Sequence, residues 1–174
     1  MDALEALLSR RSIRKYTSEP VPDELITKIL EAAMSAPSAA NEQPWHFIVI
    51  RDREVLDAIP RFHPYTAMLK HAQVAILVCS DMRLDMCDGY WVQDCSAASE
   101  NILIAAHASG LGAVWTGIFP TKDRVDNMKK LLGIPDDIIP LSLIPIGYPD
   151  ESKPAAKRFN ESRIHIDKWQ AQPL

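Results

Sequence analysis

Residues 88–120 read DGYWVQDCSAASENILIAAHASGLGAVWTGIFP, and the organisation of the 174-residue chain is best followed outward from them. The first part of this stretch, residues 90–109, is rich in Ala and Ser and predicts a long helix with Ala98, Ile102, Ala105 and Ala106 on one apolar stripe. A helix with so many small residues packs very closely against another helix. That second helix belongs either to the same chain or, across a dimer axis, to another copy of it.

Two glycines, Gly110 and Gly112, end this helix, and residues 113–119 predict the strand that follows. Together with Gly117, these glycines superficially resemble the fingerprint of a dinucleotide-binding fold. They follow a helix and precede a strand, however, which is the reverse of the order in that fingerprint. The sequence therefore argues against a Rossmann dinucleotide site.

Three further strands are predicted. Residues 45–50 are aromatic and β-branched, and residues 74–79 form a continuous apolar run that is typical of a central strand buried on both faces. The last strand spans residues 138–146, where Pro140 and Pro145 predict an edge or an irregular strand. With the predicted helices between them, the elements follow one another as α-α-β-α-β-α-β-α-β.

The composition is that of a soluble globular protein, with 47 % apolar and 24 % charged residues. A net charge of −4 argues against a general nucleic-acid binder. No apolar run approaches the roughly 20 residues that cross a membrane, and residues 1–5 do not begin a signal peptide. The histidines are scattered along the chain, which argues against a metal site.

The cysteines predict the cellular compartment. Cys79, Cys87 and Cys95 are odd in number and have no Cys-x-x-Cys spacing, which predicts reduced thiols in a cytoplasmic protein. Cys79 and Cys95 are expected to pack in the interior. For Cys87, a redox role is an alternative to simple burial.

A local excess of positive charge occurs at Arg10-Arg11-Ser12-Ile13-Arg14-Lys15. Arginines offer planar, bidentate donors to the oxygens of a phosphate monoester, and a serine adds a hydroxyl. The cluster therefore predicts a phosphate site, with a solvated helix end as the alternative.

A second candidate stretch is APSAANEQPW, residues 36–45. The side chains of Asn41 and Gln43 each combine a donor and an acceptor, which suits the edge of a heterocycle with alternating carbonyl and N–H groups. The flanking prolines would hold these amides in place. An ordinary capped turn is the alternative.

Two more stretches complete the candidate site. In WTGIFP, residues 115–120, Gly117 would let the backbone approach a flat ring and offer it an N–H, unless the glycine marks a bulge. Lys157 and Arg158 form a second basic pair, which could close a cage around a dianion or could belong to a solvated tail.

In their order and spacing, these motifs resemble the nitroreductase family in its short, single-domain form. The resemblance covers RRSIR at residues 10–14, APSAANEQPWHF at 36–47, residues 88–120 and GYPDE at 147–151. It implies an α+β fold, a three-layer sandwich with a mainly antiparallel central sheet flanked by helices. Residues 1–174 would form one domain, in which residues from about 149 to 174 are an extended tail exchanged between subunits.

The resemblance also implies a homodimer with FMN at the subunit interface. Arg10, Ser12 and Arg14 would hold the phosphate and the ribityl chain, with Arg11 beside them. The partner chain would contribute Pro37, Ser38 and Asn41, with Gln43 near the ring. The backbone of Thr116 and Gly117 would face the flavin, while Arg158 and Lys157 would return to the phosphate. The acceptor pocket would be shaped by Tyr65, Trp91 and Phe119, with core packing as the alternative for at least one of them.

The implied activity is hydride transfer from NAD(P)H through FMN to a small electron-poor acceptor, such as a nitroaromatic or a quinone, in a ping-pong cycle. No side chain is assigned as an acid or a base, since the flavin carries the chemistry. Alternatives are a flavin-storage protein with little turnover, a relative that removes halogen or uses oxygen, and a structural dimer without cofactor.

Overall fold

The computed structural model describes residues 1–154 and 156–169. Its helices are α1 (Ala3–Ser9), α2 (Asp23–Met34), α3 (Arg53–Ala58), α4 (Trp91–Ala108) and α5 (Lys122–Leu132). Its strands are β1 (Trp45–Ile50), β2 (Val74–Asp81), β3 (Gly112–Ala113), β4 (Thr116–Gly117) and β5 (Ile138–Gly147). Short 3₁₀ turns occur at Ala39–Asn41, Ile59–Arg61, Ala67–Lys70 and Glu161–Arg163.

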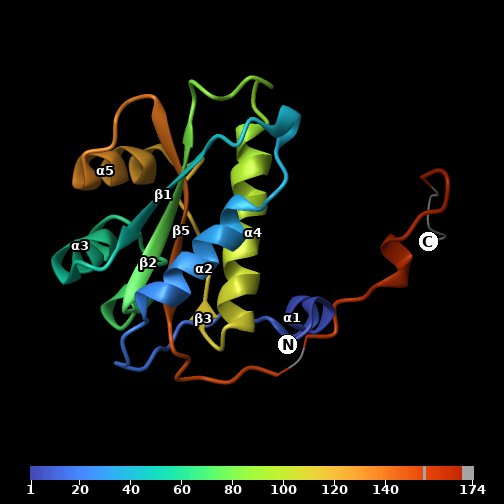
Figure 1. The fold of residues 1–174 in the computed structure, drawn as a ribbon, viewed down its shortest axis with the longest axis horizontal. Coiled ribbons are helices and arrows are strands. Elements are labelled where there is room, and N and C mark those ends of the chain that lie inside the picture. Colours follow the sequence, from blue (N-terminus) through green and yellow to red (C-terminus); the bar gives the residue numbers. More distant parts are fainter. Residues whose placement is uncertain (155, 170–174) are drawn as a thin grey trace.

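The strands form one sheet in the order β1-β2-β5-β3, with β4 also paired to β5, and every pairing is antiparallel. Helices α2 and α4 cover one face of this sheet, and α3 and α5 cover the other (Figure 1). Alternate residues of β2 point into these two layers, and the whole strand is buried. The predicted α+β sandwich and its doubly buried central strand are therefore confirmed.

The prediction of an edge position for the last strand is wrong, although its irregularity is real. β5 lies between β2 on one side and β3 and β4 on the other. Pro140 lies at the register shift opposite Cys79, where the pairing is already disturbed. Pro145 lies between the stretches that pair with β3 and with β4, and its carbonyl accepts a hydrogen bond from the Tyr16 hydroxyl at 3.2 Å. Both prolines therefore occupy places where a ladder N–H is not required.

The predicted strand 113–119 is broken into β3 and β4, because the segment that links α1 to α2 runs beside it. Ser12 bridges to Ala113, and the N–H of Ile13 donates to the carbonyl of Ala113 at 3.0 Å. A side chain at Gly112 would place its Cβ 2.6 Å from Cγ2 of Ile13. Gly112 therefore lies in a strand and permits this close passage, rather than ending the helix.

The small residues of α4 pack within the chain. Ala98, Ile102 and Ala106 are fully buried, and α2 is the helix that lies against them. The side-chain amide of Asn101 donates to the carbonyl of Ala32 in α2 at 2.9 Å. Of the two alternatives for this stripe, the contact within the chain is the one observed. In the described part of the chain, no helix is long and apolar enough to span a membrane.

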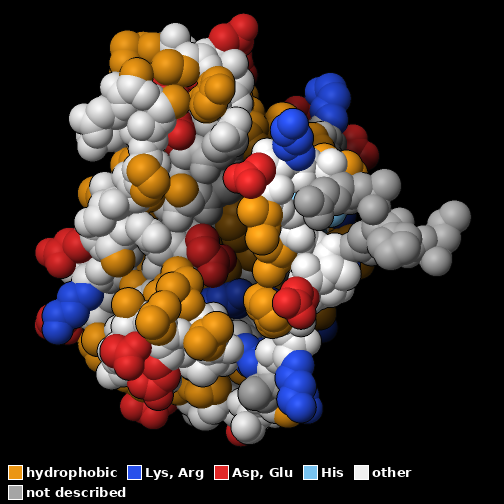
Figure 2. All heavy atoms as spheres, turned by 90° about the vertical axis from the view of Figure 1, so that its right-hand side faces the viewer, with side chains coloured by type: hydrophobic (Ala, Val, Ile, Leu, Met, Phe, Trp, Pro, Cys, Tyr) orange, Lys and Arg blue, Asp and Glu red, His pale blue; other side chains and the backbone are white. Residues whose placement is uncertain are grey.

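Helix α1 and the tail project from the body of the molecule (Figure 1). Leu4, Leu7 and Leu8 are 70 %, 50 % and 75 % exposed, and in α1 only Ala6 is buried. The large apolar side chains of the tail are exposed as well: Phe159, Ile164, Ile166 and Trp169. Figure 2 looks onto this side of the molecule, where hydrophobic side chains lie between charged ones. These apolar residues are not part of the core of their own subunit.

Candidate functional site

The segment from Arg10 to Tyr16 connects two cavities. It leaves α1, passes β3 and ends at Tyr16, which bridges to Pro149. One cavity, here called the Gly117 pocket, opens beside Arg14, and the other, the tail pocket, opens beside Arg10 and Arg11.

The Gly117 pocket has a volume of about 480 Å³. Its walls come from segment 10–16, from the loop after α3, from β4 and its approach, and from α5. The lining residues are Arg14, His63, Pro64, Tyr65, Ala67, Met68, Trp115, Thr116, Gly117 and Arg124. Two of these described residues are arginines and none is an acid. A Cβ at Gly117 would come no closer than 3.9 Å to the neighbouring atoms, so the chain leaves this face of β4 open.

One atom of this pocket, the carbonyl oxygen of Gly117, accepts two hydrogen bonds from side chains. His63 Nε2 and Arg124 Nη1 each lie 2.9 Å from it. Since a carbonyl can only accept, the proton of the neutral imidazole is on Nε2. Burial, and then the nearby Arg124 cation, lower the pKa of His63, which favours this neutral form. Neither residue is predicted from the sequence, because nothing local to His63 or Arg124 marks it as a partner of Gly117.

The tail pocket brings the two basic stretches together. It is lined by Leu7, Leu8, Arg10, Arg11, Ala156, Lys157, Arg158 and Phe159. Arg10 pairs with Glu100 at 3.3 Å. Arg11 donates from Nε to the carbonyl of Pro154 at 2.9 Å, whereas its Nη2 is buried and has no partner among the described residues. The pocket therefore combines an excess of positive charge with an unused donor.

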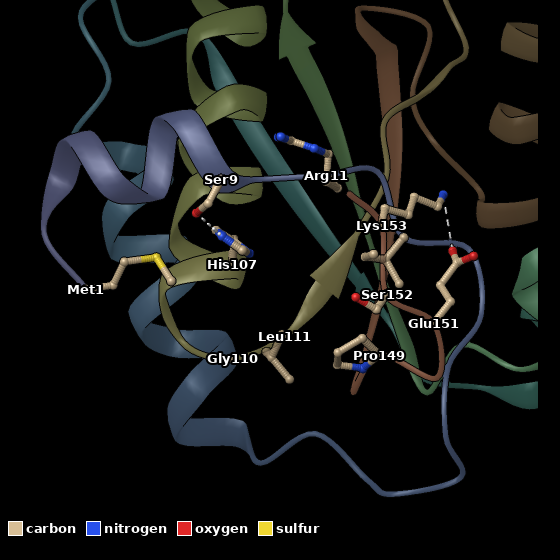
Figure 3. Close-up of a pocket in the computed structure, with 11 residues that line it drawn as sticks. Met1, Ser9, Arg11, His107, Gly110, Leu111, Pro149, Glu151, Ser152 and Lys153 are labelled. Atoms are coloured by element: carbon tan, nitrogen blue, oxygen red, sulfur yellow. Dashed lines mark hydrogen bonds and ion pairs between the residues drawn. The ribbon is translucent and has the colours of Figure 1, made fainter. Parts of the chain in front are cut away.

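A third cavity, drawn in Figure 3, lies between α1, the end of α4 and residues 149–153. Here Ser9 Oγ lies 2.7 Å from Nε2 of His107, and Lys153 pairs with Glu151 at 3.3 Å (Figure 3). Glu151 also accepts from the N–H of Arg14 at 2.6 Å, and this hydrogen bond is the main reason that its pKa is lowered. Lys153 donates to the carbonyl of Ser12. Glu151 and Lys153, which sequence reasoning also missed, thus fix the backbone of segment 10–16.

The amide loop, residues 37–43, lies elsewhere in the chain. Gln43 Nε2 donates to Asn41 Oδ1 at 3.2 Å, and the N–H of Gln43 donates to Ser38 Oγ at 3.0 Å. Both amide residues have a positive φ and are exposed, as Pro37 is. The loop is tied to the start of α4 through Asp94, whereas Arg10 pairs with Glu100, six residues and about 9 Å further along that helix at 1.5 Å per residue. Within one chain, the structure does not bring the amide loop to the arginine cluster.

Beneath this loop lie two buried carboxyl groups, those of Glu42 and Asp94. Glu42 Oε2 accepts from the N–H groups of Met86 and Cys87 at 2.8 and 3.1 Å, and Asp94 Oδ1 accepts from Ala39 at 3.0 Å. Burial, together with the Glu42 carboxyl, raises the pKa of Asp94. The pair thus links the amide loop to α4 and to residues 86–87.

The cysteine environments do not favour a reactive thiol. Burial raises the pKa of Cys79 and of Cys95 to about 12, in agreement with their predicted packing role. The pKa of Cys87 is raised by desolvation and by the nearby Glu42 carboxyl. Since the thiolate is the reactive species, these shifts favour inert cysteines.

The three aromatic residues expected in an acceptor pocket have different environments. Tyr65 lines the Gly117 pocket, is 69 % exposed, and lies under the guanidinium of Arg124 at 5.3 Å from the ring centroid. Trp91 is buried in the core and packs edge-on against Phe119, with ring centroids 4.8 Å apart. Neither Trp91 nor Phe119 lines the pocket. Core packing is therefore the role of Trp91.

The protein is an α+β sandwich in which one cationic segment runs between an open pocket and a basic one. A family model described as "Nitroreductase family" matches residues 7–72 and 63–148. The chain belongs to the nitroreductase family.

Individual relatives cover almost the whole chain. It is 58 % identical over 169 residues to the "Putative NADH dehydrogenase/NAD(P)H nitroreductase" of Methanothermobacter thermautotrophicus, covering 97 % of this chain and 88 % of the relative. A crystal structure of a Parabacteroides distasonis protein with the same name is 43 % identical with a TM-score of 0.92, covering 96 % of this chain and 98 % of that one. An FMN-dependent nitroreductase from Clostridium difficile is 30 % identical with a TM-score of 0.88, covering 95 % and 99 %.

Proposed function

We propose that this protein is an FMN-dependent NAD(P)H oxidoreductase that reduces a small electron-poor acceptor, of the nitroaromatic or quinone type, in a ping-pong cycle. The names of its relatives support the reaction class. One observation carries the proposal. Segment 10–16 runs from the cationic tail pocket to the Gly117 pocket, which is open and has no acid among its described lining residues.

The residues present fit FMN, which combines a phosphate dianion with a flat ring. Arg10, Arg11, Lys157 and Arg158 line the tail pocket, and the Nη2 atom of Arg11, a residue that also lines the third cavity, is buried and has no partner among the described residues. A dianion in a partly dry site needs several such groups. At the other end, the open face of Gly117 leaves room for a ring.

In this assignment, Arg10, Arg11, Ser12 and Arg14 hold the phosphate and ribityl chain, and Lys157 and Arg158 close the site. Thr116 and Gly117 face the ring. When bound, FMN supplies the hydride-transfer chemistry. The chain itself binds and orients the ring, and the arginines of the pocket favour negative charge there. Donor and acceptor would use the Gly117 pocket in turn.

The proposed site is shared between two subunits of a cytoplasmic homodimer. The amide loop of the partner, with Pro37, Ser38, Asn41 and Gln43, would complete the ring end of the site. Within the described part of one chain, this loop and the arginine cluster line different cavities and share no hydrogen bond or ion pair, which supports that arrangement. The exposed apolar side chains of α1 and the tail support an exchanged tail that packs on the partner.

The binding assignment is tested by Arg14→Ala. This side chain lines the Gly117 pocket, and its loss removes a charge-assisted contact with the cofactor. We expect the FMN dissociation constant to rise by about tenfold, which corresponds to roughly 1.4 kcal/mol. Equilibrium dialysis measures the effect, with Arg51→Ala as the control because Arg51 pairs with Asp23 instead. An unchanged dissociation constant would show that Arg14 does not hold the cofactor.

The reaction class is tested on the protein purified without added cofactor. We expect a visible flavin spectrum that bleaches anaerobically with NADH or NADPH, and steady oxidation of the nicotinamide once a nitroarene is added. A flavin that bleaches without turnover would identify a storage protein. A colourless protein that takes up no FMN would overturn the proposal.

A further inference from the structure

The Gly117 pocket contains a hydrogen-bond network centred on one backbone oxygen. His63 and Arg124 come from the loop after α3 and from α5, and they meet on this oxygen of β4. His63 is buried, whereas Tyr65, against which Arg124 lies, is mostly exposed. The network therefore joins the buried side of β4 to the open wall of the cavity.

The two donors act on a peptide group that β5 holds from the opposite side. The N–H of Ile118 donates to the carbonyl of Leu141 at 2.9 Å, so the carbonyl of Gly117, across the same trans peptide, points away from β5. In an antiparallel strand, the N–H and C=O of one residue point the same way. The N–H of Gly117 therefore also points away from β5.

This peptide needs external support because β4 is short. The strand has two residues and, among the described strands, pairs only with β5. Gly117 has no side chain that could hold this peptide group in place from the outer side of β4. Two hydrogen bonds to its carbonyl, one of them from a cation, replace a second neighbouring strand.

We infer that His63 and Arg124 are positioning residues, which fix the Gly117–Ile118 peptide and thereby the direction of the Gly117 N–H toward the ring. This inference rests on the proposed function, in which Gly117 faces FMN. Arg124 holds the carbonyl by geometry as well as charge, since its guanidinium is kept in place by the Tyr65 ring. His63 contributes a neutral donor.

The test compares Arg124→Met and His63→Leu, which remove the donors, with Arg124→Lys and His63→Gln, which keep an N–H. Lys122→Met is the matched control, since it removes a cation from the same turn of α5 that pairs with Asp126 instead. Hydrogen exchange of the Gly117 and Ile118 amides is measured by NMR on the cofactor-free protein. The FMN-loaded protein then gives the flavin midpoint potential, the FMN dissociation constant and the kcat and KM.

We expect amide exchange to be about tenfold faster in Arg124→Met and His63→Leu, because a hydrogen bond to a carbonyl that restrains local opening is lost. The midpoint potential should become more negative and kcat should fall by about tenfold, with a much smaller change in KM. Arg124→Lys and His63→Gln should recover part of each effect. Lys122→Met should behave as the wild type.

Each contrary result has one meaning. Unchanged exchange of the Gly117 and Ile118 amides in both Arg124→Met and His63→Leu would show that the two donors do not restrain this peptide. Faster exchange with unchanged potential and kcat would reduce the two residues to a structural role and overturn the positioning inference. If a donor-free variant does not fold, the Lys and Gln variants carry the same comparison at smaller amplitude. If the wild type binds no FMN, the proposed function fails, and the positioning role fails with it. Amide exchange in the cofactor-free protein still decides whether His63 and Arg124 restrain the Gly117–Ile118 peptide.

Discussion

Gly112 and Gly117 are five positions apart, and each lacks a side chain for a different reason. Gly112 is the place where segment 10–16 crosses the sheet, and any Cβ there would meet Ile13 at 2.6 Å. Gly117 has open space above it, with the nearest atom 3.9 Å from a Cβ. The first glycine is therefore required by the fold, whereas the second is not, and in the proposed site it leaves room for the cofactor ring.

This contrast predicts opposite outcomes for two alanine substitutions. Gly112→Ala should lower the free energy of unfolding by about 1–3 kcal/mol, as overpacking usually does. Gly117→Ala should change it by less than about 0.5 kcal/mol, as expected away from packed sites. We expect only Gly117→Ala to weaken FMN binding in the folded protein. Urea unfolding and flavin titration measure the two quantities, and equal destabilisation by both substitutions would contradict this division.

At the scale of elements, the buried pair Glu42 and Asp94 joins the amide loop to α4. Oε1 of Glu42 and Oδ2 of Asp94 are buried and have no donor among the described residues. Burial and the neighbouring Glu42 carboxyl raise the pKa of Asp94, so the protonated form of Asp94 is favoured beneath the amide loop.

The pH dependence of stability follows from the raised pKa of Asp94. Between the ordinary pKa of 3.8 and the raised one, the folded protein binds more protons than the unfolded chain. The free energy of unfolding should therefore fall as pH rises through this window and should remain at the lower value above it. Glu42→Gln keeps the acceptor for Met86 and Cys87 and removes the like charge.

We expect Glu42→Gln to raise the free energy of unfolding at pH 7 by on the order of 1 kcal/mol and to flatten its dependence on pH. Denaturant titrations from pH 4 to pH 8 measure this effect. Glu31→Gln, at an exposed position of α2, is the control. Lower stability at every pH would mean that the carboxylate of Glu42 is needed in its charged form.

At the scale of the whole molecule, α1 and the tail leave apolar side chains outside the core of their own subunit. In the proposed dimer these residues are buried by the partner, and each flavin site needs both chains. Binding of FMN and association of subunits should therefore be linked, since each stabilises the other.

Leu4→Asp tests this linkage. The residue is 70 % exposed in the first turn of α1, where a carboxylate is favourable to the helix dipole, so the subunit itself should fold normally. We expect a weaker dimer that releases FMN on dilution, as followed by light scattering and flavin fluorescence in the same samples. Leu84→Asp, at another exposed leucine outside α1 and the tail, should leave both unchanged. A folded monomer that retained its flavin would contradict the shared site.

The sequence by itself determined most of the elements, because their signals are local, although it did not show that the strand predicted at 113–119 is divided into β3 and β4. β1 occupies the predicted residues 45–50, Asp52 caps α3 through the N–H groups of Glu54 and Val55, and Gly133 ends α5 with a φ of 65°. Hydrophobic periodicity and capping depend on residues a few positions apart, so one chain segment is enough to read them. The ordered succession of motifs was enough to indicate the family.

Only the tertiary structure decided which of these elements meet. The prolines of β5 favoured an edge or an irregular strand, and only the structure shows that the strand is central and irregular, with the prolines at a register shift and at the gap between β3 and β4. His63 and Arg124 are far apart in sequence, and they become part of the site because both reach one carbonyl of β4. Any side chain with an N–H can donate to such a carbonyl. Which side chain does so is decided by three-dimensional proximity, and no local sequence pattern encodes this proximity.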